Sequence, residues 1–161
     1  MKTKGTPFFH QEEIIPATFE NLKVVGEFIG RACVAAGFND SVTYAIQLAV
    51  DEACSNIIEH AYQNAYLSIR GVCEIECTCA VDDEALYVEL HDHGEPFNPA
   101  EIPEPDTTAE LALRSKGGLG LYFIRRLMDE VSFRFVPEAE HEDPEAAGNF
   151  LLMVKFRAQA A

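Results

Sequence analysis

The segment that most limits what this chain can fold into is the glycine-rich stretch Ser115–Val131, SKGGLGLYFIRRLMDEV. It opens with Gly117, Gly118 and Gly120, and apolar residues then recur at helical spacing (Leu121, Phe123, Ile124, Leu127, Met128). Glycines let backbone N–H groups approach a ligand, and a helix start adds unpaired donors and a positive dipole end. The pattern predicts a phosphate-binding loop, and it also fits a simple turn before a buried helix.

Charge distinguishes the surroundings of this loop from the rest of the chain. The formal net charge is −15, which argues against a nucleic-acid partner because such domains carry a basic face. Arg114, Lys116, Arg125 and Arg126 nevertheless crowd around the glycines. A phosphate ligand would explain this concentration, whereas a solvated helix end is the preferred interpretation for Arg125 and Arg126.

Length and composition favour one globular domain spanning 161 residues, of which 48% are hydrophobic. The apolar runs are too short to span a membrane, and the first residues lack the apolar region of a signal peptide. We therefore expect a cytoplasmic protein with no membrane partner.

Periodicity predicts an alternation of helices and strands. Helices are expected from about Phe19 to Ala36, capped by Thr18 and ended by Gly37, and then to about Ala61, with Asp40 or Ser41 as the cap. A third follows the glycine loop. Strands are expected at 8–16, 71–81, 85–91, 132–136 and 150–157.

The cysteines show no metal-binding spacing. Cys73, Cys77 and Cys79 share one face of a predicted strand with Ile75, while glutamates and a threonine occupy the other face. This alternation favours cysteine as a small buried hydrophobe over a zinc ligand.

Two polar residues stand out on the second predicted helix. Glu52 and Asn56 are four residues apart and therefore lie on one face, beside the small residues Ala49 and Ala53. The carboxylate could accept a proton, and the amide oxygen could bind a phosphate-bound Mg²⁺. An exposed polar pair on an amphipathic helix is the alternative.

The strand at 85–91 ends in Asp92, followed by Gly94. A carboxylate here could accept a hydrogen bond from the exocyclic amine of an adenine, although a plain turn is the alternative. His91 and His93 flank Asp92 and should point away from it, so His91 is expected to pack or be solvated on the opposite face. A His-Asp-His metal site is disfavoured.

Residues from about 98 to 117 form a long connection rich in proline and acidic residues. Such a connection is either a functional lid or disordered. Because it leads into the glycine loop, we expect a lid over a ligand.

Three separated motifs together resemble a known superfamily. EACSNIIEHAY is similar to the N-box of the histidine-kinase/gyrase/Hsp90-type ATPases, DHGEPFNP to their first glycine box and GGLGLYFIRRLMDEV to their second. The sequences of these motifs most resemble those of the anti-sigma-factor serine/threonine kinase branch. The resemblance covers roughly residues 15–157.

The resemblance implies an α/β two-layer sandwich of the Bergerat type, with helices on one face of a mixed, largely antiparallel sheet. It implies ATP and Mg²⁺ as cofactors, with an anti-anti-sigma factor, a sigma factor and a second copy of the chain as partners. By correspondence with the motifs, Glu52 is the catalytic carboxylate, Asn56 the Mg²⁺ ligand and Asp92 the adenine-binding residue. The remaining nucleotide-binding positions are Gly94, Gly118, Leu119, Gly120 and Leu121, with Arg114 or Lys116 as the lid cation.

The leading hypothesis is thus an anti-sigma regulatory factor that phosphorylates a serine or threonine of its anti-anti-sigma partner. A nucleotide-gated binding module that transfers no phosphate is the second. An interaction domain with a vestigial pocket is the third, and the presence of Glu52, Asn56, Asp92 and the glycines argues against it.

Overall fold

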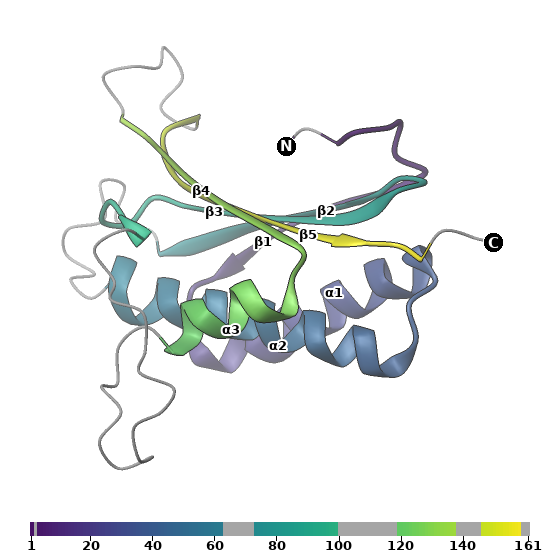
Figure 1. Cartoon of the computed structure of the whole chain (residues 1–161). Coiled ribbons are helices and arrows are strands. Elements are labelled where there is room, and N and C mark those ends of the chain that lie inside the picture. Colours follow the sequence, from purple (N-terminus) through teal and green to yellow (C-terminus); the bar gives the residue numbers. More distant parts are fainter. Residues whose placement is uncertain (2, 63–72, 100–118, 138–145, 159–161) are drawn as a thin grey trace.

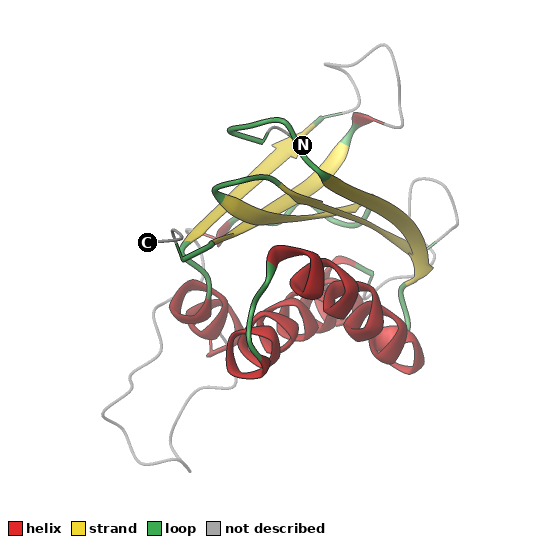
Figure 2. Ribbon diagram, turned by 90° about the vertical axis from the view of Figure 1, so that its right-hand side faces the viewer, coloured by secondary structure: helices red, strands yellow, loops and turns green. Residues whose placement is uncertain are grey.

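The computed structural model describes residues 1, 3–62, 73–99, 119–137 and 146–158. Within these residues the chain folds into two layers, a twisted sheet and a layer of helices packed on one of its faces (Figures 1 and 2). This is the expected α/β sandwich. The order of elements is β1, α1, α2, β2, β3, α3, β4 and β5.

The sheet has five described strands in the order β1-β2-β3-β5-β4, and all neighbours pair antiparallel. The strands are β1 (Phe9–Pro16), β2 (Glu74–Val81), β3 (Ala85–Asp92), β4 (Glu130–Val136) and β5 (Gly148–Phe156). Side chains of a strand alternate between the two faces of the sheet. Leu86, Val88 and Leu90 of β3 are buried against the helices. Asp92 is two residues beyond Leu90, so its side chain faces the same way.

Among the described residues, three α-helices cover the inner face: α1 (Leu22–Ala36), α2 (Asp40–Asn56) and α3 (Leu119–Leu127). A short 3₁₀ turn, Phe19–Asn21, precedes α1, and a π-helical turn, Ile57–Ala61, extends α2. Helix α1 ends as expected at Gly37, whose φ of 76° is left-handed and favours glycine. The core lies between the layers and includes Phe28, Ile46, Val88 and Met153.

Two expected caps differ from the structure. Thr18 precedes the 3₁₀ turn and makes no side-chain capping bond. Asn39, rather than Asp40 or Ser41, caps α2, since its side chain accepts a 3.0 Å hydrogen bond from the Val42 N–H. Asn39 has the extended backbone typical of an N-cap residue, and the side-chain pattern does not distinguish neighbouring polar residues.

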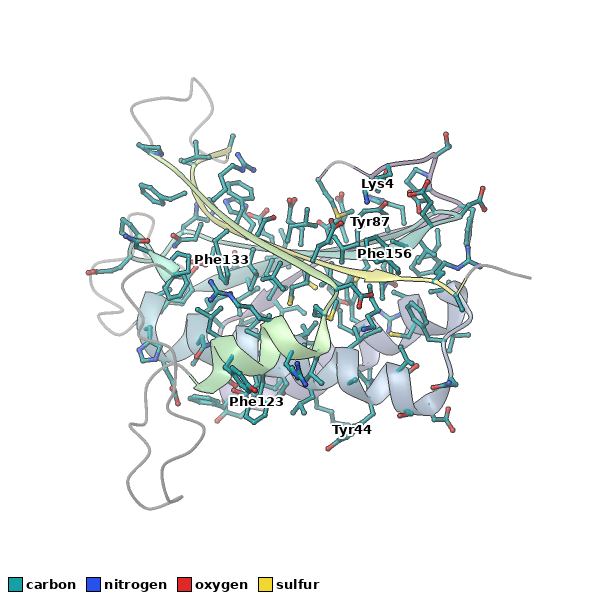
Figure 3. The ribbon with its side chains drawn as sticks, viewed as in Figure 1. Lys4, Tyr44, Tyr87, Phe123, Phe133 and Phe156 are labelled. Carbon is teal, nitrogen blue, oxygen red and sulfur yellow. The ribbon has the colours of Figure 1, made fainter. Side chains whose placement is uncertain are left out.

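One residue of the expected apolar stripe on α3 lies outside the core. Leu121, Ile124 and Met128 are buried, but Phe123 is 39% exposed. Phe123 lies on the outer side of the helix layer, as does Tyr44 of α2 (Figure 3). Arg125 and Arg126 are also exposed in the last turn of α3, which confirms the preferred interpretation of a solvated helix end.

The first residues of the chain cover part of the outer face of the sheet. The Lys4 N–H donates to the Tyr87 hydroxyl at 3.1 Å, and the Lys4 ammonium lies over the Phe156 ring (Figure 3). The cysteines follow the predicted parity, because Cys77 and Cys79 are buried in β2.

The expected lid at about 98–117 lies almost wholly outside the described residues. Within the part of the chain that the structure describes, no helix is both long and apolar enough to cross a membrane.

Candidate functional site: a pocket between α2, α3 and the end of β3

The first turn of α3 lies directly against the polar face of α2. A Cβ atom on Gly120 would lie 2.9 Å from Glu52 Oε2 and 3.1 Å from Asn56 Nδ2. Real Cβ contacts are essentially never shorter than 3.0 Å, so any other residue would push the two polar side chains aside. The structure therefore brings the predicted carboxylate, the predicted amide and the second glycine box together.

Asp92 is buried at the end of β3, on the face that carries the helices. Its Oδ1 accepts 2.9 Å hydrogen bonds from the Gly94 N–H and from Asn149 Nδ2. Within the described part of the chain, Oδ2 receives neither bond and keeps its acceptor capacity. Burial raises the pKa of the Asp92 carboxyl above its ordinary value, and the bonds from Asn149 and Gly94 oppose that rise.

Asn149 holds Asp92 and the following loop in one arrangement. Asn149 of β5 is the register partner of Asp92, so the two side chains meet across the sheet. Its Nδ2 also donates to the Glu95 carbonyl at 2.9 Å, and its Oδ1 accepts from the Phe97 N–H at 2.9 Å. These bonds satisfy buried polar groups that would otherwise be costly.

Gly94 allows the end of β3 to pack tightly against the end of α2. A Cβ atom at this position would lie 2.5 Å from the carbonyl oxygen of Ala61, the last residue of the π-helical turn. The Glu95 N–H donates to that same carbonyl at 3.0 Å, and the Tyr62 N–H donates to the carbonyl of Ile57, five residues earlier. Single π-turns of this kind are frequent at functional sites.

These elements enclose a pocket of about 200 Å³. Of the predicted site residues that the structure describes, three from separated segments line it: Asn56, Asp92 and Leu121. Glu52 does not line it, but lies one helical turn away against Gly120. The other lining residues are mostly apolar: Ala53, Ile57, His60, Ala61, Glu95, Pro96, Phe97, Ile124, Phe133, Arg134, Asn149, Phe150 and Leu151. A concave, mainly apolar pocket with a few convergent polar groups is the usual form of a small-molecule site.

Other predicted residues cannot be placed. Arg114, Lys116 and Gly118 lie outside the described residues, and of Leu119 only its position at the start of α3 is described.

The polar residues of the pocket fit a nucleotide and its metal ion. Asp92 and Asn56 both carry side-chain oxygens at one pocket. The Asp92 carboxylate fits an adenine amine, and the Asn56 amide oxygen fits a phosphate-bound Mg²⁺.

The sequence reasoning missed Asn149 and Gly148 at this site. Gly148 has a φ of +123°, and a Cβ there would clash with the Asp92 carbonyl oxygen. The strand expected from the sequence begins at residue 150, just after these two residues, whereas β5 begins at Gly148. The Gly-Asn pair resembles a turn signal, and only the register with β3 shows its connection to Asp92.

The chain also matches a known protein family. The family model described as histidine kinase-like ATPase domain matches residues 15–155. The chain belongs to this family. The match spans most of the chain and includes all three motifs, which confirms the resemblance noted from the sequence.

Individual relatives carry a more specific name. The chain is 31% identical over 120 residues to the serine-protein kinase RsbW of Bacillus licheniformis, covering 72% of each chain. It is 31% identical over 121 residues to RsbW of Bacillus subtilis (strain 168), covering 73% of this chain and 72% of that protein. RsbW of Bacillus mycoides (strain KBAB4) is 27% identical over 121 residues, with the same shares.

Proposed function

We propose that this protein is an ATP- and Mg²⁺-dependent serine/threonine protein kinase and an anti-sigma regulatory factor. Its phosphate acceptor would be a serine or threonine of an anti-anti-sigma partner, and its second partner a sigma factor. The kinase names of the relatives support the reaction class. The observation that carries the proposal is the convergence of Asn56, Asp92 and α3 on one pocket, with Glu52 against Gly120.

The pocket supports a division of labour for nucleotide binding. Asp92 Oδ2 would accept a hydrogen bond from the adenine amine, while Asn149 holds the carboxylate in place. Gly118 and Gly120 would let backbone N–H groups at the start of α3 approach the phosphates. Asn56 would bind Mg²⁺, which when bound neutralises phosphate charge. The lid cation would be Arg114 or Lys116.

The reaction needs a base and careful positioning rather than a covalent intermediate. The hydroxyl oxygen of the partner forms a bond to the terminal phosphorus of ATP, the bond to the bridging oxygen breaks, and ADP leaves. Glu52 would accept the hydroxyl proton. Its position beside Asn56 and the α3 start supports this role, because both groups must face the phosphates.

Transfer of radiolabelled phosphate tests the proposal. The full chain is incubated with γ-labelled ATP, Mg²⁺ and an anti-anti-sigma domain from the same genome, and label on that domain is measured. Glu52→Gln should keep ATP affinity within about twofold and lower the transfer rate by at least about 100-fold, since general base catalysis contributes about 10²–10⁴. Glu59→Gln is the matched control, because Glu59 is exposed on the same helical segment.

Each other outcome contradicts a defined part of the proposal. Normal transfer by Glu52→Gln would exclude Glu52 as the base. ATP binding by the wild type without transfer would favour a nucleotide-gated binding module. A wild-type chain that binds no nucleotide would favour an interaction domain. The proposal further includes a cytoplasmic location and a homodimer. Sedimentation of the purified chain tests the homodimer.

A further inference from the structure

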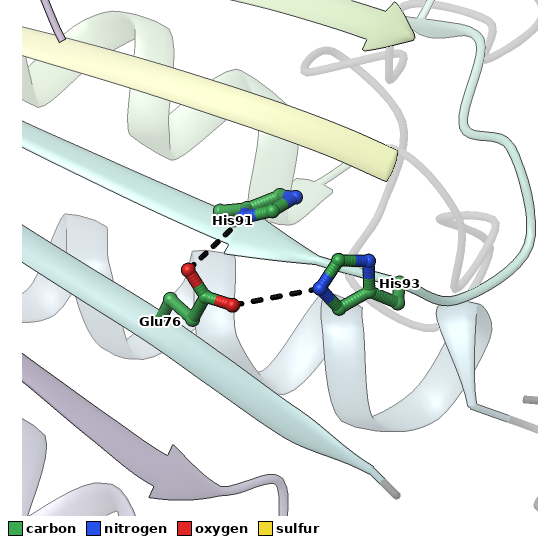
Figure 4. Close-up of side chains that lie close together, drawn as sticks. All are labelled: Glu76, His91 and His93. Carbon is green, nitrogen blue, oxygen red and sulfur yellow. Dashed lines mark hydrogen bonds and ion pairs between the residues drawn. The ribbon is translucent and has the colours of Figure 1, made fainter. Parts of the chain in front are cut away.

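A second group of polar side chains lies on the outer face of the sheet, opposite the pocket. Glu76 of β2 and His91 of β3 are direct register partners, and His93 follows two residues later on the same face. Figure 4 shows the Glu76 carboxylate beside both imidazole rings, with one oxygen paired to each ring. The nucleotide pocket uses none of these side chains, although both histidines flank Asp92.

The three side chains converge closely enough to share one ion. Glu76 Oε2 lies 3.2 Å from His91 Nδ1, and Glu76 Oε1 lies 3.5 Å from His93 Nε2. One ligand atom from each residue lies within 4.8 Å of the others. Ligands of a tetrahedral Zn²⁺ with bonds of about 2.0–2.1 Å are separated by about 3.3 Å, so the two Glu76 contacts already match this spacing. The three ligand atoms as a set, now within 4.8 Å, would draw together on binding.

His91 is held in the orientation that a metal ligand requires. Its ring stacks on Phe150 with centroids 4.0 Å apart and an angle of 7° between the planes. Its Nε2 lies 2.8 Å from the Ala147 carbonyl oxygen. A carbonyl can only accept, so Nε2 carries a hydrogen, and Nδ1 is the ring nitrogen that faces Glu76.

The contact between His91 and Glu76 is one that a metal ion can occupy. His91 Nδ1 and the carboxylate oxygen lie 3.2 Å apart, so a positive centre belongs between them, either a proton on Nδ1 or a metal ion that takes its place. A metal-bound imidazole also usually donates a hydrogen bond from the N–H of its other ring nitrogen, often to a backbone carbonyl. His93 is anchored as well, since its backbone N–H donates to the Tyr62 hydroxyl at 3.1 Å.

We propose that Glu76, His91 and His93 bind a divalent first-row transition metal ion such as Zn²⁺, at a site separate from the nucleotide pocket. Two imidazoles and one carboxylate suit Zn²⁺ and its neighbours, whereas Mg²⁺ and Ca²⁺ prefer oxygen ligands only. The three protein ligands leave a fourth position for water. The site is distinct from the Mg²⁺ proposed at Asn56, which lies among the helices on the other face of the sheet.

The wild-type chain provides the first test, without nucleotide and with Mg²⁺ in excess. Calorimetric titration with Zn²⁺ should give one ion per chain. On addition of Zn²⁺, imidazole ¹⁵N signals of His91 and His93 should shift, while those of His10 and His60 stay in place. Co²⁺ should give visible bands without the intense near-ultraviolet band of a thiolate ligand. Burial raises the pKa of the Cys54 thiol to about 12, which keeps that cysteine protonated.

Two ligand variants and one matched control complete the test. His93→Gln and Glu76→Gln should each weaken Zn²⁺ binding by at least about tenfold, because even loss of an outer partner costs that much. His10→Gln should leave it unchanged, since His10 forms an exposed pair with Glu12 at 3.3 Å outside the cluster. Circular dichroism of the metal-free variants checks that they are folded. The imidazole shifts are measured on the wild type and so do not depend on the folding of any variant.

The proposal is overturned if the wild type binds no Zn²⁺, or if the shifted imidazoles are those of His10 or His60. A thiolate band with Co²⁺ would assign the ion to cysteine instead. Equal losses in His10→Gln and His93→Gln would show nonspecific surface binding.

Discussion

At the scale of single residues, folding shifts the pKa of two buried aspartates in opposite directions. Burial raises the pKa of Asp92, which receives bonds from Asn149 and Gly94. Burial alone would also raise the pKa of Asp82, but backbone N–H groups of Ala85, Glu84 and Gly5 together lower it. The ionised form is therefore disfavoured by folding at Asp92 and favoured at Asp82.

Asp92→Asn should separate stability from nucleotide binding. The amide oxygen of the new side chain can still accept from Gly94 and Asn149, which places the NH₂ group where Oδ2 was. A donor would then face the donor amine of adenine, and ATP affinity should fall at least about tenfold. Thermal stability at pH 7 should stay equal or rise, because the cost of a buried charge is removed. Calorimetry and thermal denaturation measure both, and unaltered ATP affinity would contradict the adenine assignment.

The stability effect of Asp92→Asn should also depend on pH. A folded-state pKa above the unfolded value makes the contribution of Asp92 to stability largest at low pH, and this contribution falls as pH rises through the folded pKa. The gain of Asp92→Asn should therefore shrink as pH falls towards about 4. Asp82→Asn is the control with the opposite sign: it should destabilise at neutral pH, lose its effect in acid and leave ATP affinity unchanged.

At the scale of elements, the end of β3 and the π-helical turn after α2 depend on the absence of one side chain. Gly94 faces the backbone of Ala61, which cannot move aside as a flexible side chain could. Gly26, in the interior of α1, has nothing within 4 Å of an added Cβ. The same substitution should therefore have opposite effects at the two positions.

Gly94→Ala should lower the free energy of unfolding by about 1–3 kcal/mol, the usual cost of overpacking. Gly26→Ala should raise it by about 0.5–1 kcal/mol, because alanine loses less backbone freedom in a helix. Urea denaturation measures both. Gly94→Ala should also weaken ATP binding, since Gly94 precedes pocket residues; a Gly94→Ala variant as stable as the wild type would contradict the close packing.

At the scale of the whole molecule, the −15 charge works against the compact state. The described ion pairs on the surface, such as Lys4–Glu130 at 3.5 Å, are exposed and contribute little. The protein without nucleotide should therefore become more stable as NaCl rises from about 0.02 to about 0.5 M, because salt screens the repulsion. Thermal denaturation measures this, with KCl as the control salt. A falling midpoint would show that ion pairs outweigh the repulsion.

The sequence determined the elements and the motifs, because helical and strand periodicity and glycine content are local properties. Helical spacing placed Glu52 and Asn56 on one face, strand parity turned His91 away from Asp92, and Gly37 ended α1 as expected. The local pattern predicted the wrong cap where several neighbouring polar residues could serve: Asn39 caps α2, not Asp40 or Ser41. The roles of the predicted site residues stay predictions.

Only the tertiary structure decided which distant residues meet. Asn149 reaches Asp92 because β5 pairs with β3 in one particular register, and Gly94 is required because the π-helical turn ends at that point. Glu76 joins His91 and His93 through the pairing of β2 with β3. Contacts between segments depend on register and packing, and these follow from the burial of the entire core rather than from any single stretch of sequence.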